Sequence, residues 1–260
     1  MLGWRRILTR SAVEALALTR AGSAAKAGLR VLMYHAVGSA AAQDRLGIYS
    51  VAPELFAHQI AALAAYEGAT TVNLEHGMAS TARLRIAVTF DDGYRDNLYR
   101  AAPILQQHGI PFTVFVCTGF IRQASGSYLS PDDLRELAAL RGVTIGSHGA
   151  THAPLTRLDE RALHDELATS KTYLEDVTGR AVTSLSYPHG AVNCRVIDAA
   201  ARAGYTIGAC SRFDINSGAR HPLLLCRTDI LGIDSVRVFK QKLHGDWDIY
   251  RWRNPDPARL

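Results

Sequence analysis

The 260-residue sequence lacks the features that mark several specialised classes of protein. No stretch approaches the roughly 20 consecutive apolar residues that a membrane-spanning helix needs. There is no collagen period, no heptad array and no internal repeat. Apolar residues make up 48% and charged residues 20%, which is ordinary globular usage and excludes a disordered chain. The length fits one large domain, since barrels and other α/β folds routinely use about 200–250 residues.

Cysteine is also scarce, and no C-x-x-C pair occurs among the four residues of this type, Cys117, Cys194, Cys210 and Cys226. Three of them lie in apolar runs, where a thiol usually behaves as a small buried hydrophobe. We therefore expect reduced thiols, as in a cytoplasmic protein. Arg10, Glu14 and Arg20 interrupt the apolar residues near the N-terminus, so the sequence does not predict a signal peptide.

Charge of one sign is concentrated in a single segment of the chain. Residues 1–30 hold six Lys and Arg against one Glu, whereas the remainder holds 23 basic and 23 acidic residues. Because basic and acidic residues are equal in number after residue 30, this part of the chain does not suggest binding to nucleic-acid phosphates. Residues 2–20 are predicted as a helix with an apolar stripe and with arginines away from it. This helix either packs on the domain or lies on the anionic inner face of a membrane, with residues 21–28 as its linker.

Short, β-branched apolar segments alternate with helix-like segments from residue 29 onward. The predicted strands cover residues 29–37, 70–74, 85–90, 112–117, 143–148, 184–187, 205–210 and 223–230. The predicted helices cover residues 53–66, 96–108, 131–140, 157–178, 192–203 and 235–244. Continuous apolar runs of this length are typical of parallel strands that are buried on both faces.

Polar residues stand at or just past the ends of several predicted strands. In a barrel these carboxyl ends meet at one mouth, whereas an open sheet would spread them along its edge. The predicted fold is therefore an α/β fold, a distorted or incomplete (β/α) barrel with the site at the C-terminal ends of the strands.

The first motif is Thr89-Phe90-Asp91-Asp92-Gly93, at the end of a predicted strand. Two adjacent carboxylates repel each other unless a cation or a shared proton compensates them. At a strand end followed by glycine, the chain can turn so that both carboxylates face one pocket. The alternative is an ordinary turn or helix cap, because Asp and Gly are common turn residues.

The second motif is Ser147-His148-Gly149-Ala150-Thr151-His152. Two imidazoles four residues apart suit a metal ion in a turn, although a histidine pair is also common in purely structural settings. Together with one carboxylate of the Asp91-Asp92 pair, they form a set that suits Zn²⁺ with an open position, or Fe, Ni or Co. The ligand set does not choose among these metals.

The third motif, Ser186-Tyr187-Pro188-His189-Gly190, also stands at a strand end. Proline and glycine would fix a turn whose backbone N–H at His189 faces the mouth of the barrel. A plain strand-to-helix turn is the alternative.

These motifs, in this order, resemble the polysaccharide deacetylase family (NodB-homology domain, carbohydrate esterase family 4). The resemblance covers residues 29–232, which leaves residues 1–28 as an N-terminal helix and linker and residues 233–260 as a C-terminal helix and tail. It implies a catalytic base at Asp91, metal ligands at Asp92, His148 and His152, and an oxyanion donor at the peptide N–H of His189. Enzymes of this family remove acetyl groups from N-acetylated sugars.

The sequence departs from the family pattern at three places. Gly149 stands where many members have Ser or Thr, and Thr151 is a candidate to replace that hydroxyl. Ser186 stands where many members have an arginine that holds the catalytic aspartate, and we expect Arg227 to supply the missing guanidinium. The family's late Leu-x-His motif, which provides the general acid, has no clear counterpart.

Three histidines are therefore candidates for the general acid. His35 at the end of the first predicted strand is preferred, although a buried structural histidine would fit the same position. His244, next to Leu243 in the last predicted helix, is less favoured than His35. His189 is a third option.

The sequence thus predicts a metal-dependent deacetylase of an N-acetylated sugar or glycan, with Zn²⁺ as the preferred metal. A lipid-linked glycan becomes a reasonable substrate if residues 1–20 contact a membrane. A deformylase or another C–N amidohydrolase would use the same machinery. A non-catalytic glycan-binding protein on a degenerate barrel is the alternative of a different class, and an Fe(II) oxygenase fits the paired aspartates poorly.

Overall fold

The computed structural model describes residues 13, 25–40, 44, 46–78, 83–122 and 126–253. Its main sheet has eight parallel strands in the order β10-β1-β5-β6-β7-β8-β9, with β4 also paired to β5. These strands are β1 Gly28–Tyr34, β4 Ala69–Thr71, β5 Leu84–Phe90, β6 Phe112–Val116, β7 Val143–Ser147, β8 Ser184–Ser186, β9 Ile207–Ala209 and β10 Thr228–Asp229. A separate two-stranded sheet pairs β2 Ala36–Val37 with β3 Ser50–Val51.

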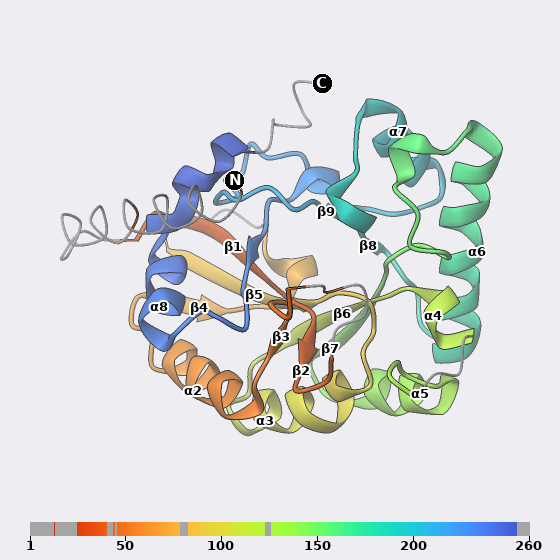
Figure 1. Ribbon diagram of the computed structural model, residues 1–260. Coiled ribbons are helices and arrows are strands. Elements are labelled where there is room, and N and C mark those ends of the chain that lie inside the picture. Colours follow the sequence, from red (N-terminus) through yellow and green to blue (C-terminus); the bar gives the residue numbers. More distant parts are fainter. Residues whose placement is uncertain are drawn as a thin grey trace.

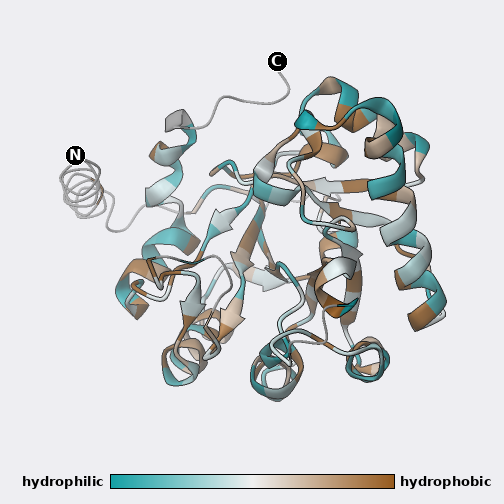
Figure 2. Cartoon of the chain, turned by 45° about the vertical axis from the view of Figure 1, so that its right-hand side comes forward, coloured by the Kyte–Doolittle hydropathy of each residue, from teal (hydrophilic) through white to brown (hydrophobic). Residues whose placement is uncertain are grey.

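The helices are α2 Pro53–Ala64, α3 Ala102–Gln107, α4 Thr118–Arg122, α5 Pro131–Ala139, α6 Glu160–Thr178, α7 Cys194–Arg202 and α8 Val236–His244. The main sheet curls into a half-barrel, and α2, α3, α5 and α6 lie along its outside (Figure 1). Figure 2 shows apolar strands at the centre of the molecule, enclosed by helices of mixed hydropathy. The predicted fold class, a distorted (β/α) barrel, is confirmed.

The two ends of the sheet approach each other through the chain that precedes β10. Leu225 forms a parallel bridge with Ala209 at the end of β9, and the N–H of Cys210 donates to the carbonyl of Leu225 at 2.8 Å. This contact is a single bridge and not a continuous ladder, so the barrel is only partly closed. The bridge brings the segment that carries Arg227 beside the ends of β8 and β9.

Successive strand residues alternate between the barrel interior and the helical layer, as the two-residue period of a strand requires. Val31 of β1 and Ala87 of β5 belong to a cluster built from strand residues on the inner side of the sheet. Leu32 and Val88 belong to the larger cluster that packs under the helices. By the same alternation Asp91, directly after β5, falls on the inner side.

Two predicted strands are wrong in part. The segment 29–37 breaks at His35, after which the chain leaves the main sheet and pairs as β2 with β3. The segment 223–230 contains a 3₁₀ turn at Pro222–Leu224 and only a two-residue strand. Asn216 explains this interruption, because its side chain binds both the N–H and the carbonyl of Cys226, at 2.7 and 2.9 Å. These groups are then not free for ladder pairing.

The six helices predicted from residue 53 onward are present, and one of them begins with an irregular turn. Ser130 caps α5 in a capping box with Asp133, and Pro131 follows at the first helical position. Residues 97–101 form a π-helical turn before α3, because Pro103 lacks the N–H that an α-helix would need there. The predicted strand at 70–74 ends at Thr71, and its last residue lies in a 3₁₀ turn.

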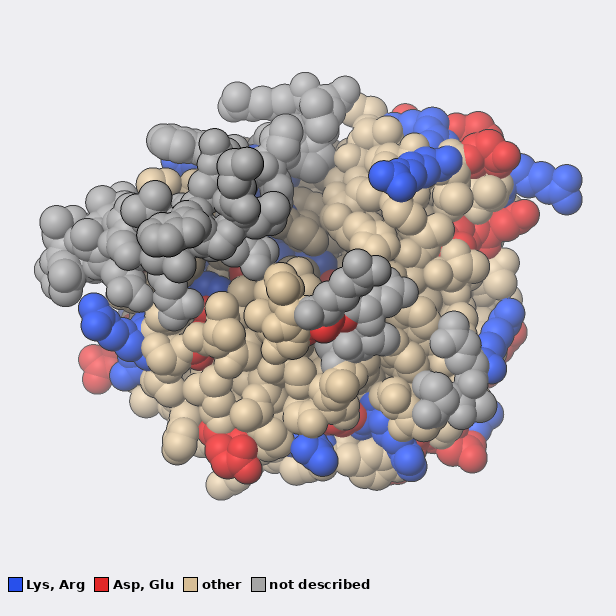
Figure 3. Space-filling view, viewed as in Figure 1, with Lys and Arg blue, Asp and Glu red and all other residues tan. Residues whose placement is uncertain are grey.

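The surface and the thiols agree with the composition. Figure 3 shows acidic and basic side chains of both signs around the rim of the face in view, with areas of uncharged surface between them. The four cysteines are free thiols, and all but Cys194 are buried. None of the helices in the described part of the chain has the length and apolarity that crossing a bilayer requires.

The predicted N-terminal helix over residues 2–20 lies outside the described residues, apart from Val13. Val13 is helical and buried in a small cluster with Val238 and Trp247. The domain boundaries at residues 28 and 232 stay predictions.

Candidate active site

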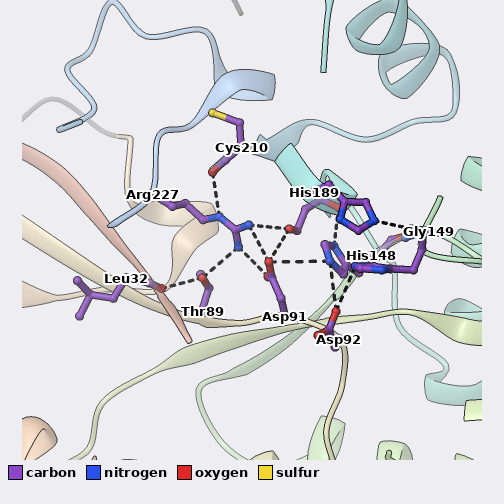
Figure 4. Close-up of polar contacts among 12 residues, drawn as sticks. Leu32, Thr89, Asp91, Asp92, His148, Gly149, His189, Cys210 and Arg227 are labelled. Carbon is purple, nitrogen blue, oxygen red and sulfur yellow. Dashed lines mark hydrogen bonds and ion pairs between the residues drawn. The ribbon is translucent and has the colours of Figure 1, made fainter. Parts of the chain in front are cut away.

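The centre of the site is a buried ion pair between Asp91 and Arg227. The guanidinium donates to the carboxylate through two parallel hydrogen bonds, Nη1 to Oδ1 at 2.7 Å and Nη2 to Oδ2 at 2.8 Å. Arg227 also donates from Nε to the carbonyl of Cys210 at 3.1 Å (Figure 4). The two side chains are essentially inaccessible to solvent, 2% and 1% exposed. The contact expected between Arg227 and Asp91 is therefore present.

Ser186 completes this arrangement at the end of β8. Its hydroxyl donates to Asp91 Oδ2 at 3.1 Å and accepts from Arg227 Nη2 at 2.8 Å. A side chain as short as serine leaves the space between β8 and β5 that the Arg227 guanidinium occupies. The arginine missing from the third motif is thus replaced by one from the segment before β10.

The electrostatics favour an ionised Asp91. Burial by itself would raise the pKa of this carboxyl, but the charge and hydrogen bonds of Arg227 and the neighbouring His148 outweigh it. The net effect holds the pKa of Asp91 well below its usual value. Asp91 is therefore a carboxylate across the ordinary pH range.

Asp92 faces the same pocket because the chain turns sharply after β5. Asp92 and Gly93 both have left-handed backbone conformations, with φ of 74° and 79°. This turn overrides the alternation that would send adjacent side chains to opposite faces. Asp92 is only 8% exposed, and its buried Oδ1 has no hydrogen-bond partner among the described residues. A buried oxygen of this kind calls for a cation or a proton.

The two histidines of the second motif converge on that oxygen. His148 Nε2 lies 3.5 Å and His152 Nε2 lies 3.4 Å from Asp92 Oδ1. The three ligand atoms all lie within 4.8 Å of one another. His148 Nδ1 donates to the carbonyl of Ser186 at 2.8 Å, which leaves the lone pair on Nε2, facing Asp92.

The protonation states suit a metal centre. Burial, with a smaller contribution from Asp91, raises the pKa of Asp92 to about 7. Burial lowers the pKa of His148 to about 4 and, together with the charges of His148 and His189, that of His152 to about 3. Two neutral imidazoles and an unsatisfied carboxylate oxygen are the donor set that a divalent transition metal takes. Asp92, His148 and His152 therefore fit such a cation.

His189 lies at the open side of this cluster. It is exposed, has a φ of 59°, and its Nε2 donates to the carbonyl of His152 at 3.2 Å. Its ring centroid lies 4.5 Å from that of His152. The third motif is thus brought to the metal candidates, while the oxyanion role of the His189 N–H stays a prediction.

His35 borders the site at the end of β1. Its Nδ1 is buried without a hydrogen-bond partner among the described residues, and its ring packs on Tyr49 at 4.8 Å between centroids. Burial lowers the pKa of His35, while Asp91 opposes this shift. The N–H of Asp91 donates to the carbonyl of Tyr34, the residue before His35, at 2.9 Å, so His35 lies near the site. Its role as general acid stays a prediction.

His244, which is less favoured than His35, is not brought to the site. Its Nδ1 pairs with Asp246 at 2.8 Å at the end of α8. The preceding carbonyl, of Leu243, accepts from Arg30 Nε at 3.0 Å near the start of β1, at the opposite end of that strand from the site.

Sequence reasoning missed two residues that touch this site. A hydrogen bond from Tyr94 opposes the rise in the pKa of Asp92. Glu166 binds the loop between the two histidines from α6, where its carboxylate accepts from the N–H of Thr151 at 2.6 Å. The sequence does contain a signal for Glu166: it is an acidic residue in the apolar stripe of a predicted helix, near Leu163 and Leu167.

Comparison with known proteins identifies relatives of this chain. The polysaccharide deacetylase family matches residues 79–208, half of the chain. YxkH of Bacillus subtilis, provisionally named a polysaccharide deacetylase, is 32% identical over 123 residues, which are 47% of this chain and 43% of YxkH. The peptidoglycan-N-acetylglucosamine deacetylase PgdA of Listeria monocytogenes is 30% identical over 44% of this chain and 23% of its own length.

A solved structure matches more of the chain than these relatives do. The Streptococcus pyogenes deacetylase PplD, solved in complex with acetate, has a TM-score of 0.75 and 26% identity, over 84% of this chain and 99% of PplD. The sequence matches, by contrast, span less than half the length of YxkH and of PgdA. The family match, together with the fold, shows that this chain belongs to the polysaccharide deacetylase family.

Proposed function

We propose that this protein is a metal-dependent deacetylase that hydrolyses the acetamide of an N-acetylated sugar or glycan to acetate and a free amine. The observation that carries the proposal is the ionised Asp91, which is not a member of the metal cluster yet lies beside it. Its Oδ2 is 3.9 Å from His148 Nε2. A base and a cation site at this separation suit the activation of one water molecule between them.

Asp92, His148 and His152 would hold the cation, with Zn²⁺ preferred and Ni, Co or Fe as alternatives. When bound, it would polarise the acetyl carbonyl and lower the pKa of water at the site. A carboxylate and two imidazoles leave a fourth position open, as catalytic zinc sites do. Asp92 would then be paired with a positive charge, which removes the cost of its unsatisfied Oδ1.

The chain's own groups divide the remaining work. Asp91 accepts the proton of the attacking water, while Arg227 and Ser186 hold its two oxygens in place. The backbone N–H of His189 stabilises the charge that develops on the carbonyl oxygen; the loss of one such donor typically costs about 2.7–4 kcal/mol. His35 or His189 donates a proton to the nitrogen as the C–N bond breaks.

The name of PgdA supports an N-acetylhexosamine unit as the substrate. The equal numbers of basic and acidic residues after residue 30 give no indication of a charged polymer as the substrate. A cytoplasmic protein that acts on a lipid-linked glycan at the inner membrane face is a further part of this proposal, and it rests on the basic residues 1–30.

The test is acetate release from a panel of N-acetylhexosamines and their oligomers by protein loaded with Zn²⁺, Co²⁺ or Ni²⁺. We expect acetate and an equal amount of free amine with at least one substrate, and at least about a hundredfold slower release from the Asp91→Asn variant. Formate as the product would favour a deformylase. Tight sugar binding without turnover under all three metals would favour the glycan-binding alternative.

A further inference from the structure

Glu166 is a buried acid that the proposed reaction does not use. It lies on the inner face of α6, 6% exposed, in line with Leu163, Leu167 and Leu174. Its carboxylate binds a single residue twice: Oε1 accepts from the N–H of Thr151 at 2.6 Å, and Oε2 accepts from the Thr151 hydroxyl at 3.0 Å. Such a group is rarely buried without a specific partner, and here the partner is the loop between the two histidines.

The same loop is held from its other side by the first residues of α4. The N–H of Thr118 donates to the carbonyl of Gly149 at 3.2 Å, and that of Gly119 donates to the carbonyl of Ala150 at 2.7 Å. A side chain at position 119 would collide with this carbonyl, since a Cβ there would lie 2.4 Å from the oxygen. The loop is therefore clamped between α4 and α6.

This clamp acts on a strained part of the backbone. His152, directly after Thr151, has a φ of 65°, a conformation that residues other than glycine rarely adopt. Conformations of this kind persist only where the surroundings impose them. The two hydrogen bonds that Glu166 accepts come from Thr151, the residue before His152, so they hold the peptide that turns this imidazole toward Asp92.

The Glu166 carboxylate lies where a side chain at position 149 would begin, so the glycine there leaves room for it. A Cβ at position 149 would lie 2.8 Å from Glu166 Oε1, closer than real side chains pack. Where many members of the family have a hydroxyl at this position, this chain has no side chain and a carboxylate in the adjoining space. The hydroxyl of Thr151 meets that carboxylate, so the loop is tied down from α6.

From these contacts we propose that Glu166 is a positioning residue of the metal centre. It is not a ligand. It fixes the turn so that His148 Nε2 and His152 Nε2 converge within 3.5 and 3.4 Å of Asp92 Oδ1. The inference rests on the proposed function only in that the loop is taken to hold a divalent cation.

The test measures zinc affinity, without any sugar, by competition with a chromophoric chelator. We expect Glu166→Ala to weaken zinc binding by about 10–100-fold, as losses of outer-shell partners do. Glu166→Gln should weaken zinc binding by less than about tenfold, because its amide can accept from the Thr151 N–H and donate to the Thr151 hydroxyl. Thr151→Val keeps the N–H but loses the hydroxyl, so its zinc affinity should lie between those of the wild type and Glu166→Ala.

The matched control is Asp159→Ala on the same helix. Asp159 caps α6 by accepting from the N–H of Ala162 at 2.8 Å, and it does not touch the loop. This variant should lose thermal stability but bind zinc as the wild type does. Wild-type affinity in both Glu166→Ala and Thr151→Val, or an equal loss in Asp159→Ala, would overturn the inference. A wild-type protein that binds no zinc would instead overturn the metal centre of the proposed function, and the inference with it.

Discussion

Arg227 binds Asp91 across 136 positions of the sequence, through two parallel hydrogen bonds of 2.7 and 2.8 Å. Both side chains are almost inaccessible to solvent. A buried pair of this kind is costly to break, because the remaining partner becomes an uncompensated charge. It also keeps the carboxylate ionised and immobile. The charge and position of the proposed base therefore depend on Arg227, a residue outside the three motifs.

The first prediction separates the two adjacent aspartates. Asp91→Asn should lower kcat by about 10²–10⁴-fold, because the amide cannot accept the proton of water, while bound zinc stays near one equivalent. Steady-state acetate release and metal analysis on the same sample measure both quantities. Loss of zinc with activity retained would reverse the roles assigned to Asp91 and Asp92.

The second prediction concerns Asp92 itself. Asp92→Asn should abolish zinc binding, yet it should raise the melting temperature of the metal-free protein by roughly 2–4 °C for each kcal/mol gained. The reason is that Asp92 Oδ1 is buried without a partner beside the charge of Asp91. Calorimetry on chelator-treated protein checks this. A fall in melting temperature would show that the carboxylate is well satisfied without metal.

The third prediction moves the arginine to the place that the family uses. Arg227→Met should destabilise the fold by about 3–5 kcal/mol, because Asp91 then stays buried without its counter-charge. It should also reduce acetate release. Adding Ser186→Arg to this variant should restore part of both properties, since the side chains at positions 186 and 227 both bind the Asp91 carboxylate.

Denaturant unfolding and kcat of the single and double variants provide the measurement. Ser186→Arg in the presence of Arg227 serves as the control, and it should be destabilising because two guanidinium groups would share one carboxylate. A double variant no better than Arg227→Met would contradict the equivalence of the two positions.

The fourth prediction addresses the proton that the leaving amine requires. His35→Gln should lower kcat by about 10²-fold or more, with zinc content unchanged, if His35 is the general acid. His189→Ala tests the competing candidate in the same assay. His244→Ala is the matched control, because His244 pairs with Asp246 away from the site, and its kcat should not change.

The fifth prediction tests the basic N-terminal segment. Replacement of Arg5, Arg6 and Arg10 by Glu should abolish co-sedimentation with vesicles that contain anionic phospholipid, because each basic residue near such a surface contributes about 1 kcal/mol. Neutral vesicles are the control for charge. Equal sedimentation of the variant and the wild type would remove membrane contact from the proposal.

Much of the fold follows from local patterns that the sequence contains. The apolar runs ending at Phe90, Val116 and Ser147 are strands, as predicted. Ser130 begins α5 and Gly179 ends α6, which are roles typical of these residue types. The prediction of one continuous strand over 223–230 is wrong, because the apolar residues of this run are buried without pairing continuously. An apolar pattern reports burial, and it does not show whether the backbone of each residue finds a strand partner.

What the sequence alone determined about the site is its chemistry: an Asp pair, two histidines four residues apart and a proline turn, each at a strand end. Local spacing carries that information, because a turn or a strand end is fixed by a few neighbouring residues. Only the tertiary structure decided that Arg227 meets Asp91, that Glu166 supports the histidine loop and that His244 stays remote. Such contacts depend on the order and register of strands far apart in the chain, which no local pattern specifies.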